Sequence, residues 1–389
     1  AGNGDHQGVG RVGGDGVMAK NQYKKEPLKN NVEEMFIGPF GSSLKNECFV
    51  DEEDAYCMVY EQKHAIQKTL DGKNRFVDKN KYYELKRFTI KPGDIIVSCR
   101  GTIGETFIVP ENAPLGIMHP SIMKIRLKPN VYNIEYFNLL LKNRLKDYNK
   151  SANGSGIKMA ISATELGKEL FPIPPMDEQQ KTSKIFLMVN HLILLRKQQL
   201  AKLDELVKAR FVEMFGDPIG NTKNLPVTKF VDVVKMQRGF DLPVQERKSD
   251  GMIPVYGSNG VLGYHDISKV KGGGVITGRS GTIGKVFYEK GEFWPLNTTL
   301  FSLNLHGNDV VYLKYLLELF DLSRFTEGTG VPTLNRNKFH DELIIDVPLD
   351  EQERFAAFVE RVDQQKQTVQ QSLEKLELMK KALMQEYFG

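Results

Sequence analysis

The sequence is short of cysteine and has no long apolar run. Of its 389 residues only three are cysteines, Cys48, Cys57 and Cys99, and none belongs to a CxxC pair. An odd number at these spacings argues against a disulfide framework and favours reduced thiols in a cytoplasmic protein. The densest apolar stretch, residues 185–195, is interrupted by polar residues and falls short of the ~20 residues that a membrane helix needs. We therefore expect a cytoplasmic protein without a membrane contact.

Motifs of catalytic and metal-binding sites are also lacking. The seven histidines are scattered, without an HxxxH pair or a cysteine at metal-ligand spacing. Residues 278–286 resemble a phosphate-binding loop, but Arg279 stands where that pattern needs glycine and Val286 where it needs Ser or Thr. Residues 173–176, IPPM, lack the asparagine and the aromatic residue of an adenine-methyltransferase motif. We therefore predict no catalytic residue, no metal site and no cofactor bound by this chain.

The bulk composition is that of a globular protein. Hydrophobic residues make up 40% and charged residues 26% of the chain, which excludes a largely disordered protein. A chain of 389 residues is too long for one ordinary core and favours two or three domains. The net charge of +4 permits nucleic-acid binding but does not by itself indicate it. Residues 1–17, which are rich in glycine, predict a disordered or tag-like N-terminal segment.

An internal duplication is the most informative feature present. Residues 177–216 begin DEQQ and end MFG, residues 350–389 begin DEQE and end YFG, and the two segments align without a gap at an offset of 173. Upstream, the string GTIG occurs at residues 101–104 and again at residues 281–284, each time after a β-like run. The chain therefore consists of two copies of one unit, a mixed domain followed by a long segment.

The two 40-residue segments predict long helices that pair with each other. Each carries apolar residues at a spacing of seven, which keeps one stripe facing a partner. We expect the helices to pair as an antiparallel coiled coil with pseudo-twofold internal symmetry; the alternative is that each helix packs on its own domain. The expected seam residues are Phe186, Ile193, Leu200, Val207 and Met214 in the first helix, and Phe355, Val362, Val369, Leu376 and Leu383 in the second.

The expected fold class is α+β. Short β-like segments with glycine turns fill residues 18–176 and 217–349, and we predict in each a sheet with a helix packed against it. The hairpin signal at Ser258-Asn259-Gly260 lies in the second of these domains. Residues 177–216 and 350–389 are then the first and second long helices.

Glycine-rich loops in both domains hold the candidate contact residues. Glycine lets a backbone approach a phosphate, and neighbouring polar side chains donate to phosphates or base edges. The alternative for any one of them is an ordinary turn residue; Arg100 and Arg279 stand out because each lies beside a GTIG turn. The candidates are Ser42, Ser43, Lys45, Arg100, Thr102 and Lys158 in the first domain, and Ser258, Asn259, Tyr264, His265, Arg279, Ser280 and Thr282 in the second.

This duplicated order of motifs resembles the specificity subunit of type I restriction-modification systems. Both long segments open with Pro-x-Asp-Glu-Gln and close on Phe-Gly, and GPFGSSLK at 38–45, KPGDIIVS at 91–98 and IPVYGSNGVLGYHD at 253–266 are similar to strings of that family. The resemblance covers residues 30–389. The glycine-rich N-terminus departs from the family pattern, which leaves the start of the first strand open.

The resemblance implies a non-catalytic DNA-binding protein of host defence. Residues 18–176 and 217–349 would be two target recognition domains, each reading half of an asymmetric bipartite site in double-stranded DNA. The helices would set the gap and dock two modification methyltransferase subunits, which carry S-adenosylmethionine and methylate adenine. Two restriction subunits would use ATP and Mg²⁺ to cleave DNA. The rival interpretations are a two-headed protein-binding scaffold and a self-sufficient enzyme.

Overall fold

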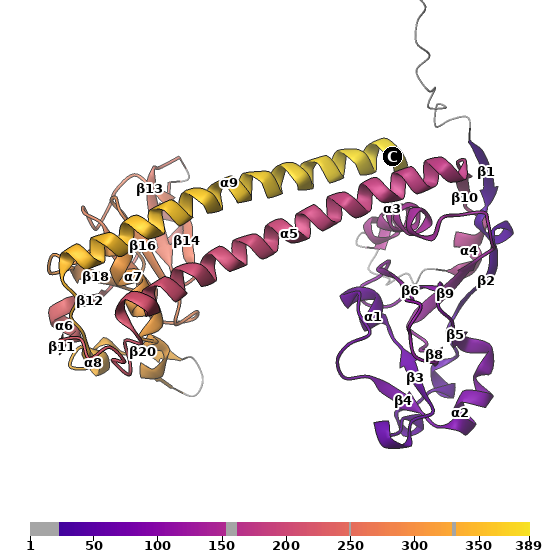
Figure 1. Cartoon of the computed structure of the whole chain (residues 1–389), viewed down its shortest axis with the longest axis horizontal. Helices are drawn as coiled ribbons and strands as arrows, with labels where there is room; N and C mark the ends of the chain where they lie inside the picture. Colours follow the sequence, from indigo (N-terminus) through magenta and orange to yellow (C-terminus); the bar gives the residue numbers. More distant parts are fainter. Residues whose placement is uncertain (1–22, 153–161, 249, 329–331) are drawn as a thin grey trace, which may run out of the picture. The chain divides into compact units, whose positions relative to one another are not determined.

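The chain divides into two compact units. The computed structural model describes residues 23–152, 162–248, 250–328 and 332–389, with the backbone alone for residues 147–152. Among these residues, unit 1 comprises the chain up to Leu192 together with Leu376–Gly389, and unit 2 comprises Ile193–Lys375. Each unit therefore contains one mixed domain and a part of each long helix (Figure 1).

The mixed domain of unit 1 has two four-stranded sheets. The first has the order β2-β9-β6-β7 with every neighbour antiparallel, and the second has the order β4-β3-β8-β5 with β3 and β8 parallel. A separate pair joins β1 (Lys24–Pro27) to β10 (Leu170–Ile173). The other strands are β2 (Val32–Ile37), β3 (Cys57–Tyr60), β4 (Arg75–Val77), β5 (Thr89–Ile90), β6 (Ile95–Ser98), β7 (Thr106–Ile108), β8 (Gly116–Met118) and β9 (Ile122–Leu127), and the helices are α1 (Gln62–Gln67), α2 (Lys79–Glu84), α3 (Ile134–Ala152) and α4 (Ala163–Lys168).

The mixed domain of unit 2 repeats the strand order of the first sheet and has a smaller second sheet. Its four-stranded sheet has the order β12-β18-β15-β16, and its three-stranded sheet β14-β13-β17 again contains one parallel pair, β13 with β17. The strands are β11 (Val227–Lys229), β12 (Lys235–Arg238), β13 (Ile253–Gly257), β14 (Gly260–His265), β15 (Gly274–Gly278), β16 (Val286–Glu289), β17 (Trp294–Pro295), β18 (Thr299–Asn304), β19 (Thr326–Glu327), β20 (Thr333–Leu334) and β21 (Leu343–Ile345), and the short helices are α6 (Phe230–Val233), α7 (Val310–Leu319) and α8 (Arg336–Phe339). The duplication inferred from the helices thus extends through both domains, and the predicted α+β fold is confirmed.

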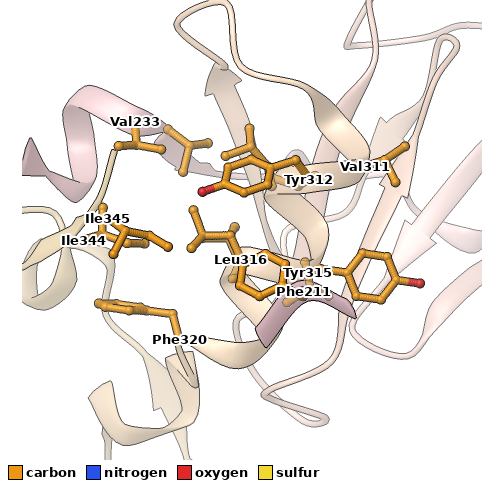
Figure 2. Packing of buried hydrophobic residues seen from close by; sticks show 14 of the residues in the cluster. Phe211, Val233, Val311, Tyr312, Tyr315, Leu316, Phe320, Ile344 and Ile345 are labelled. Atoms are coloured by element: carbon orange, nitrogen blue, oxygen red, sulfur yellow. The ribbon is translucent and has the colours of Figure 1, made fainter. Parts of the chain in front are cut away.

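Continuous apolar runs build the cores. All four residues of β6 are buried, as expected for a strand covered on both faces. Leu140 and Leu141 of α3 pack into the same cluster as Ile95 and Val97. In unit 2, Figure 2 shows Tyr312 and Leu316 of α7 packed between Phe211 of α5 and Ile345 of β21. The helices α3 and α7, which follow the sheets in the chain, therefore complete the core of their domains.

A buried glutamine fixes the start of each long helix. Gln179 accepts a hydrogen bond from the backbone N–H of Asn133 (2.8 Å) and donates to the carbonyls of Val131 and Pro174. Gln352 repeats this, because it accepts from the N–H of Asp309 (2.9 Å) and donates to Val347. The repeated DEQ string therefore has a structural role: its glutamine bonds the helix start to the start of α3 or α7.

The two 40-residue helices, α5 (Met176–Phe215) and α9 (Leu349–Phe388), pack together within each unit. In unit 1, the ring of Phe186 lies 5.7 Å from that of Phe388. In unit 2, Phe215 contacts Phe355 (5.8 Å between ring centroids) and Asp204 pairs with Lys366 (2.6 Å). Residue numbers therefore rise along α5 in the direction in which they fall along α9. The helices are therefore antiparallel there, and the alternative of two separate helices is wrong.

None of the ten expected seam residues is exposed. Phe186, Val207, Phe355, Val362 and Val369 are buried, and Ile193, Leu200, Met214, Leu376 and Leu383 are half-buried. A second row also faces inward, at Val189 and Leu203 of α5 and Val359 and Leu373 of α9. Two rows per helix are what knobs-into-holes packing requires. Among the described residues, no helix combines the length and apolar character needed to cross a membrane.

Candidate nucleic-acid interface

Three loops of unit 1 meet at one end of the sheet β2-β9-β6-β7. They meet because β2 and β6 both pair antiparallel with β9 and so end where β9 begins. The N–H of Gly38, just after β2, donates to Ile122 (3.0 Å), and the N–H of Cys99, just after β6, donates to Ser121 (2.9 Å). The mixed domain of unit 1 is called domain 1. This end of its sheet, with residues 38–45, 99–104 and 119–121, is called the loop edge of domain 1.

Glycines and one serine hold the loop edge in shape. A Cβ on Gly38 would lie 2.3 Å from the carbonyl oxygen of His119, so only glycine allows this close approach. Gly101 and Gly104 have φ values of 67° and 84°, which favour glycine. The hydroxyl of Ser98 donates to the carbonyl of Thr102 (2.6 Å) across the turn. The GTIG string is therefore a fixed turn that presents its flanking side chains to solvent.

The structure brings five predicted contact residues to the loop edge of domain 1. Ser42, Lys45, Arg100 and Thr102 are exposed there and Ser43 is half-buried. Lys158 lies outside the described residues. Hydroxyl, ammonium and guanidinium groups on one edge can donate hydrogen bonds to phosphates and base edges. The DNA contacts themselves stay predictions.

His119 is a member of the loop edge that the sequence did not single out. Its Nδ1 accepts from the backbone N–H of Ser121 (3.2 Å), which leaves the ring proton on Nε2. Burial lowers the pKa of His119, and the nearby cations Arg75 and Arg100 lower it further against the opposing effect of Glu61. The ring is therefore neutral at pH 7. Local pattern could not reveal it, because its position depends on which strand pairs with β9.

The corresponding end of the sheet β12-β18-β15-β16, in the mixed domain of unit 2 (domain 2), is built in the same way and is called the loop edge of domain 2. The N–H of Gly239, after β12, donates to Thr299 (3.1 Å), and the N–H of Arg279, after β15, donates to Thr298 (2.8 Å). A Cβ on Gly239 would lie 2.2 Å from the carbonyl oxygen of Leu296. The second GTIG turn repeats the positive φ values, 85° at Gly281 and 90° at Gly284. Arg279, Ser280 and Thr282 therefore lie together on this edge, all of them half-buried.

The predicted hairpin β13–β14 adds its turn to this edge. Asn259 accepts from the ammonium of Lys285, which follows the GTIG turn (2.9 Å). A Cβ on Gly281 would lie 3.2 Å from the hydroxyl of Ser258. The turn residues Ser258 and Asn259 therefore lie beside the second GTIG turn, although their hairpin belongs to a different sheet from β15.

Tyr264 and His265 lie away from the turn. Gly257 pairs with Gly260 next to the turn, whereas Ile253 pairs with His265 at the far end of the hairpin. His265 is only 6% exposed, and its ring packs edge-on against Trp294 at 5.3 Å. Tyr264, its neighbour on the opposite face of β14, is 49% exposed. Of these two candidates, Tyr264 alone is placed for an external contact.

Two further arginines lie beside Arg279. Arg238 ends β12 and Arg336 begins α8, and all three arginines line one hollow of about 410 Å³ at the loop edge of domain 2. No sequence pattern indicates this group, because more than 90 residues separate Arg238 from Arg336. The hollow is strongly cationic, which suits an anionic ligand.

The cysteine thiols and the possible metal ligands are the remaining reactive side chains of the two units. All three cysteines are free, and burial raises the pKa of Cys99 to about 12 and that of Cys57 to about 11. Both thiols are therefore protonated at neutral pH. Among the described residues, no three His, Cys, Asp or Glu side chains are grouped so that they could hold a metal ion. The groups that the loop edges present are hydrogen-bond donors and cations.

Comparisons with known proteins agree with the duplicated architecture. A family model described as the type I restriction modification DNA specificity domain matches residues 51–205 and again residues 223–378. The crystal structure of a type I restriction-modification system S subunit from M. genitalium matches with a TM-score of 0.58 over 95% of this chain and 96% of that chain, at 14% identity. A chain from a structural study of complex assembly and conformational transition of the type I R-M system matches with a TM-score of 0.60, at 14% identity, over 94% of this chain and 97% of that chain. At such identities the structural matches show a shared fold.

Proposed function

The chain belongs to the type I restriction modification DNA specificity family, and we propose from this premise that it reads an asymmetric bipartite DNA site for partner enzymes. The observation that carries the proposal is the double match of the specificity model, one copy on each mixed domain. In this role each loop edge contacts one half of the site. The chain itself is not an enzyme; it directs adenine methylation and restriction by other subunits in the cytoplasm.

The different residues on the two loop edges support an asymmetric site. The domains share a topology, but Arg279 follows β15 where the buried Cys99 follows β6. Side chains that differ at equivalent positions present different donors to the base edges, and base edges are distinguished by donor and acceptor pattern. The two half-sites therefore differ in sequence.

The length of the helices supports a gap between the half-sites. Each has 40 residues, which at ~1.5 Å per residue is about 60 Å, or roughly 17 base pairs at ~3.4 Å each. When tilt is allowed for, two readers at the ends of such a spacer would touch half-sites about one helical turn apart on one face of the duplex. In this proposal the helix pair sets the gap.

Exposed apolar side chains on the helices support a docking role for methyltransferase subunits. Met188 and Leu192 lie four residues apart on one face of α5, and Leu378 and Met379 lie on α9; all four are exposed. Apolar residues gathered on a helix surface mark a site of protein contact. The proposed partners are two modification subunits carrying S-adenosylmethionine and two restriction subunits using ATP and Mg²⁺.

The test that separates a DNA reader from the alternative, a two-headed protein-binding scaffold, is salt-dependent DNA binding. The chain with its modification partner is titrated with a labelled duplex at ionic strengths from 50 to 300 mM, in steps of about 50 mM. A reader binds with an affinity that falls steeply with salt, because phosphate contacts release counterions. Absence of DNA binding at low salt would rule out the reader and favour the scaffold.

A further inference from the structure

The hollow at the loop edge of domain 2 has a charge that its own side chains do not neutralise. Arg238, Arg279 and Arg336 line it, and a guanidinium is charged at every physiological pH. The one acidic residue in the lining, Glu327, is already engaged: it pairs with Lys338 (2.5 Å) and accepts from Asn335 (3.0 Å). Among the described residues, none forms an ion pair with any of the three guanidinium groups.

Backbone hydrogen bonds hold the three arginines in place. Arg279 is bonded on both sides, because its N–H donates to Thr298 and its carbonyl accepts from Leu334 (2.7 Å). Arg336 follows Asn335, whose side chain caps α8 by accepting from the N–H of Asn337 (3.1 Å). The cationic groups are therefore carried by ordered backbone on three separate elements, β12, the loop after β15 and α8.

Domain 1 shows that the fold does not need these charges. A hollow of about 660 Å³ adjoins the equivalent strand and helix there, lined by Met35, Phe36 and Ile37 of β2, by residues of α4 that include Lys168, and by Lys29. Matching hydrogen bonds identify the equivalent positions: Gly38 and Gly239 bond the start of β9 or β18 in the same way, which aligns Ile37 with Arg238. By the same comparison, Cys99 stands at the position of Arg279.

The third arginine also has an uncharged equivalent. Ser162 caps α4 as Asn335 caps α8, which aligns Ala163 with Arg336. Equivalent residues at all three positions are thus uncharged in one copy and cationic in the other. Since the sheets β2-β9-β6-β7 and β12-β18-β15-β16 correspond strand by strand, this strand order does not depend on the three arginines. A ligand is therefore a better explanation for them than folding.

We propose that the hollow lined by Arg238, Arg279 and Arg336 binds one phosphate of the DNA backbone, next to the half-site read by domain 2. The proposal rests on the proposed function. Three cations around one hollow repel one another, and an anion relieves this repulsion, whereas a neutral base edge does not. Guanidinium groups bind phosphate through paired N–H donors.

The test uses duplexes in which single phosphates are replaced by neutral methylphosphonates. The full chain with its modification partner is titrated with its recognition duplex, and the neutral group is moved along the half-site of domain 2. For the natural chain, one position lowers the affinity by about 10-fold, the effect of losing a charge-assisted contact. For Arg279→Gln the affinity is already lower by that factor, and the same methylphosphonate has no further effect.

Salt dependence and base specificity separate phosphate binding from base reading. Arg279→Gln reduces the slope of log affinity against log salt by about 0.9, the value for one phosphate, and does so on cognate and unrelated duplexes alike. Arg279→Lys keeps the slope. The control Lys229→Gln removes an exposed charge that pairs with Asp341 elsewhere in the same domain and leaves both measurements unchanged.

Two results would overturn the proposal. A loss of affinity confined to one base pair, with an unchanged salt slope, would assign Arg279 to base reading. Equal affinities of the natural chain and the Arg238→Gln, Arg279→Gln, Arg336→Gln triple variant would show that the hollow binds no phosphate, while the intact binding of the natural chain would leave the proposed function standing. If the natural complex bound no DNA, both proposals would fail.

Discussion

Among single residues, Asp94 of the KPGDIIVS string, which is similar to strings of the family, has a structural role. Asp94 is fully buried and accepts two hydrogen bonds from Arg126, both at 2.7 Å, and one from the N–H of Lys91 (2.8 Å). It lies at the start of β6, the end of the strand opposite to the GTIG turn. The aspartate of the KPGDIIVS string therefore anchors β6 at the end away from the loop edge.

Replacing Asp94 by alanine should destabilise domain 1 alone. The change removes two hydrogen bonds of the half-buried Arg126, which keeps its ion pair with Glu34 (3.1 Å), and losing such charged hydrogen bonds costs about 2 kcal/mol. Hydrogen exchange should accelerate in β6 and β9. The matched strand β15, where no such pair exists, serves as an internal control, and Asp71→Ala at an exposed site is the control variant. Unchanged exchange in β6 would contradict the anchoring role.

Single residues also mark the limit of prediction from sequence. Arg100, Arg279 and the GTIG glycines could be singled out because the string repeats. His119, Arg238 and Arg336 could not, because only strand pairing over long distances brings them to the loop edges. For Tyr264 and His265 the alternation of a strand predicts one residue inside and one outside, but not which is which.

At the scale of elements, local pattern predicted the long helices best. A spacing of seven is a property of one segment, so the seam of α5 and α9 could be found without knowing the partner. The sheet order β2-β9-β6-β7 could not be found in this way, since strand neighbours are chosen by tertiary packing. The repeated DEQ string was visible, but the role of its glutamine became clear only from its bonds to the start of α3 or α7.

Gln352→Ala should destabilise unit 2 by about 2 kcal/mol, because the buried N–H of Asp309 and carbonyl of Val347 lose their partner. The only tryptophan, Trp294, lies in unit 2, so its fluorescence on urea titration reports this unit. Gln179→Ala is the matched control: it removes the same bonds from unit 1. An equal shift of the Trp294 transition in both variants would contradict the assignment of each glutamine to its own unit.

Leu203→Asp should abolish methylation at every site. Leu203 lies in the inner row of α5 and packs against the core of unit 2, so a carboxylate there opposes helix pairing. Leu376→Asp tests the facing helix. Gln198→Asp adds the same charge at an exposed position of α5 and should keep full methylation. Normal methylation by Leu203→Asp would refute the spacer model.

As a whole, the molecule contains two copies of one unit, whose first sheets share a strand order and whose loop edges differ. The shared parts, the glutamines and the helix seam, hold each unit together. The differing parts, above all the three arginines of the hollow in domain 2, whose equivalents in domain 1 are Ile37, Cys99 and Ala163, give the two copies different contact residues. Recognition and spacing are therefore separable properties of the chain.

Inserting one seven-residue repeat into both long helices should change the gap and keep the half-sites. Seven residues add about 10 Å of helix, or roughly three base pairs, while a whole repeat preserves the seam. Sequencing of methylated DNA should show the same two half-sequences with a longer gap. Methylation at the original gap would contradict the role of the helices as a ruler.

The most direct measurement of the central claim is a genome-wide map of methylated adenines in cells that express this chain with its modification partner. The account predicts one asymmetric bipartite motif with a fixed gap and one methylated adenine in each half, absent from cells that express the partner alone. An active methyltransferase whose methylation pattern is the same with and without this chain would contradict the account.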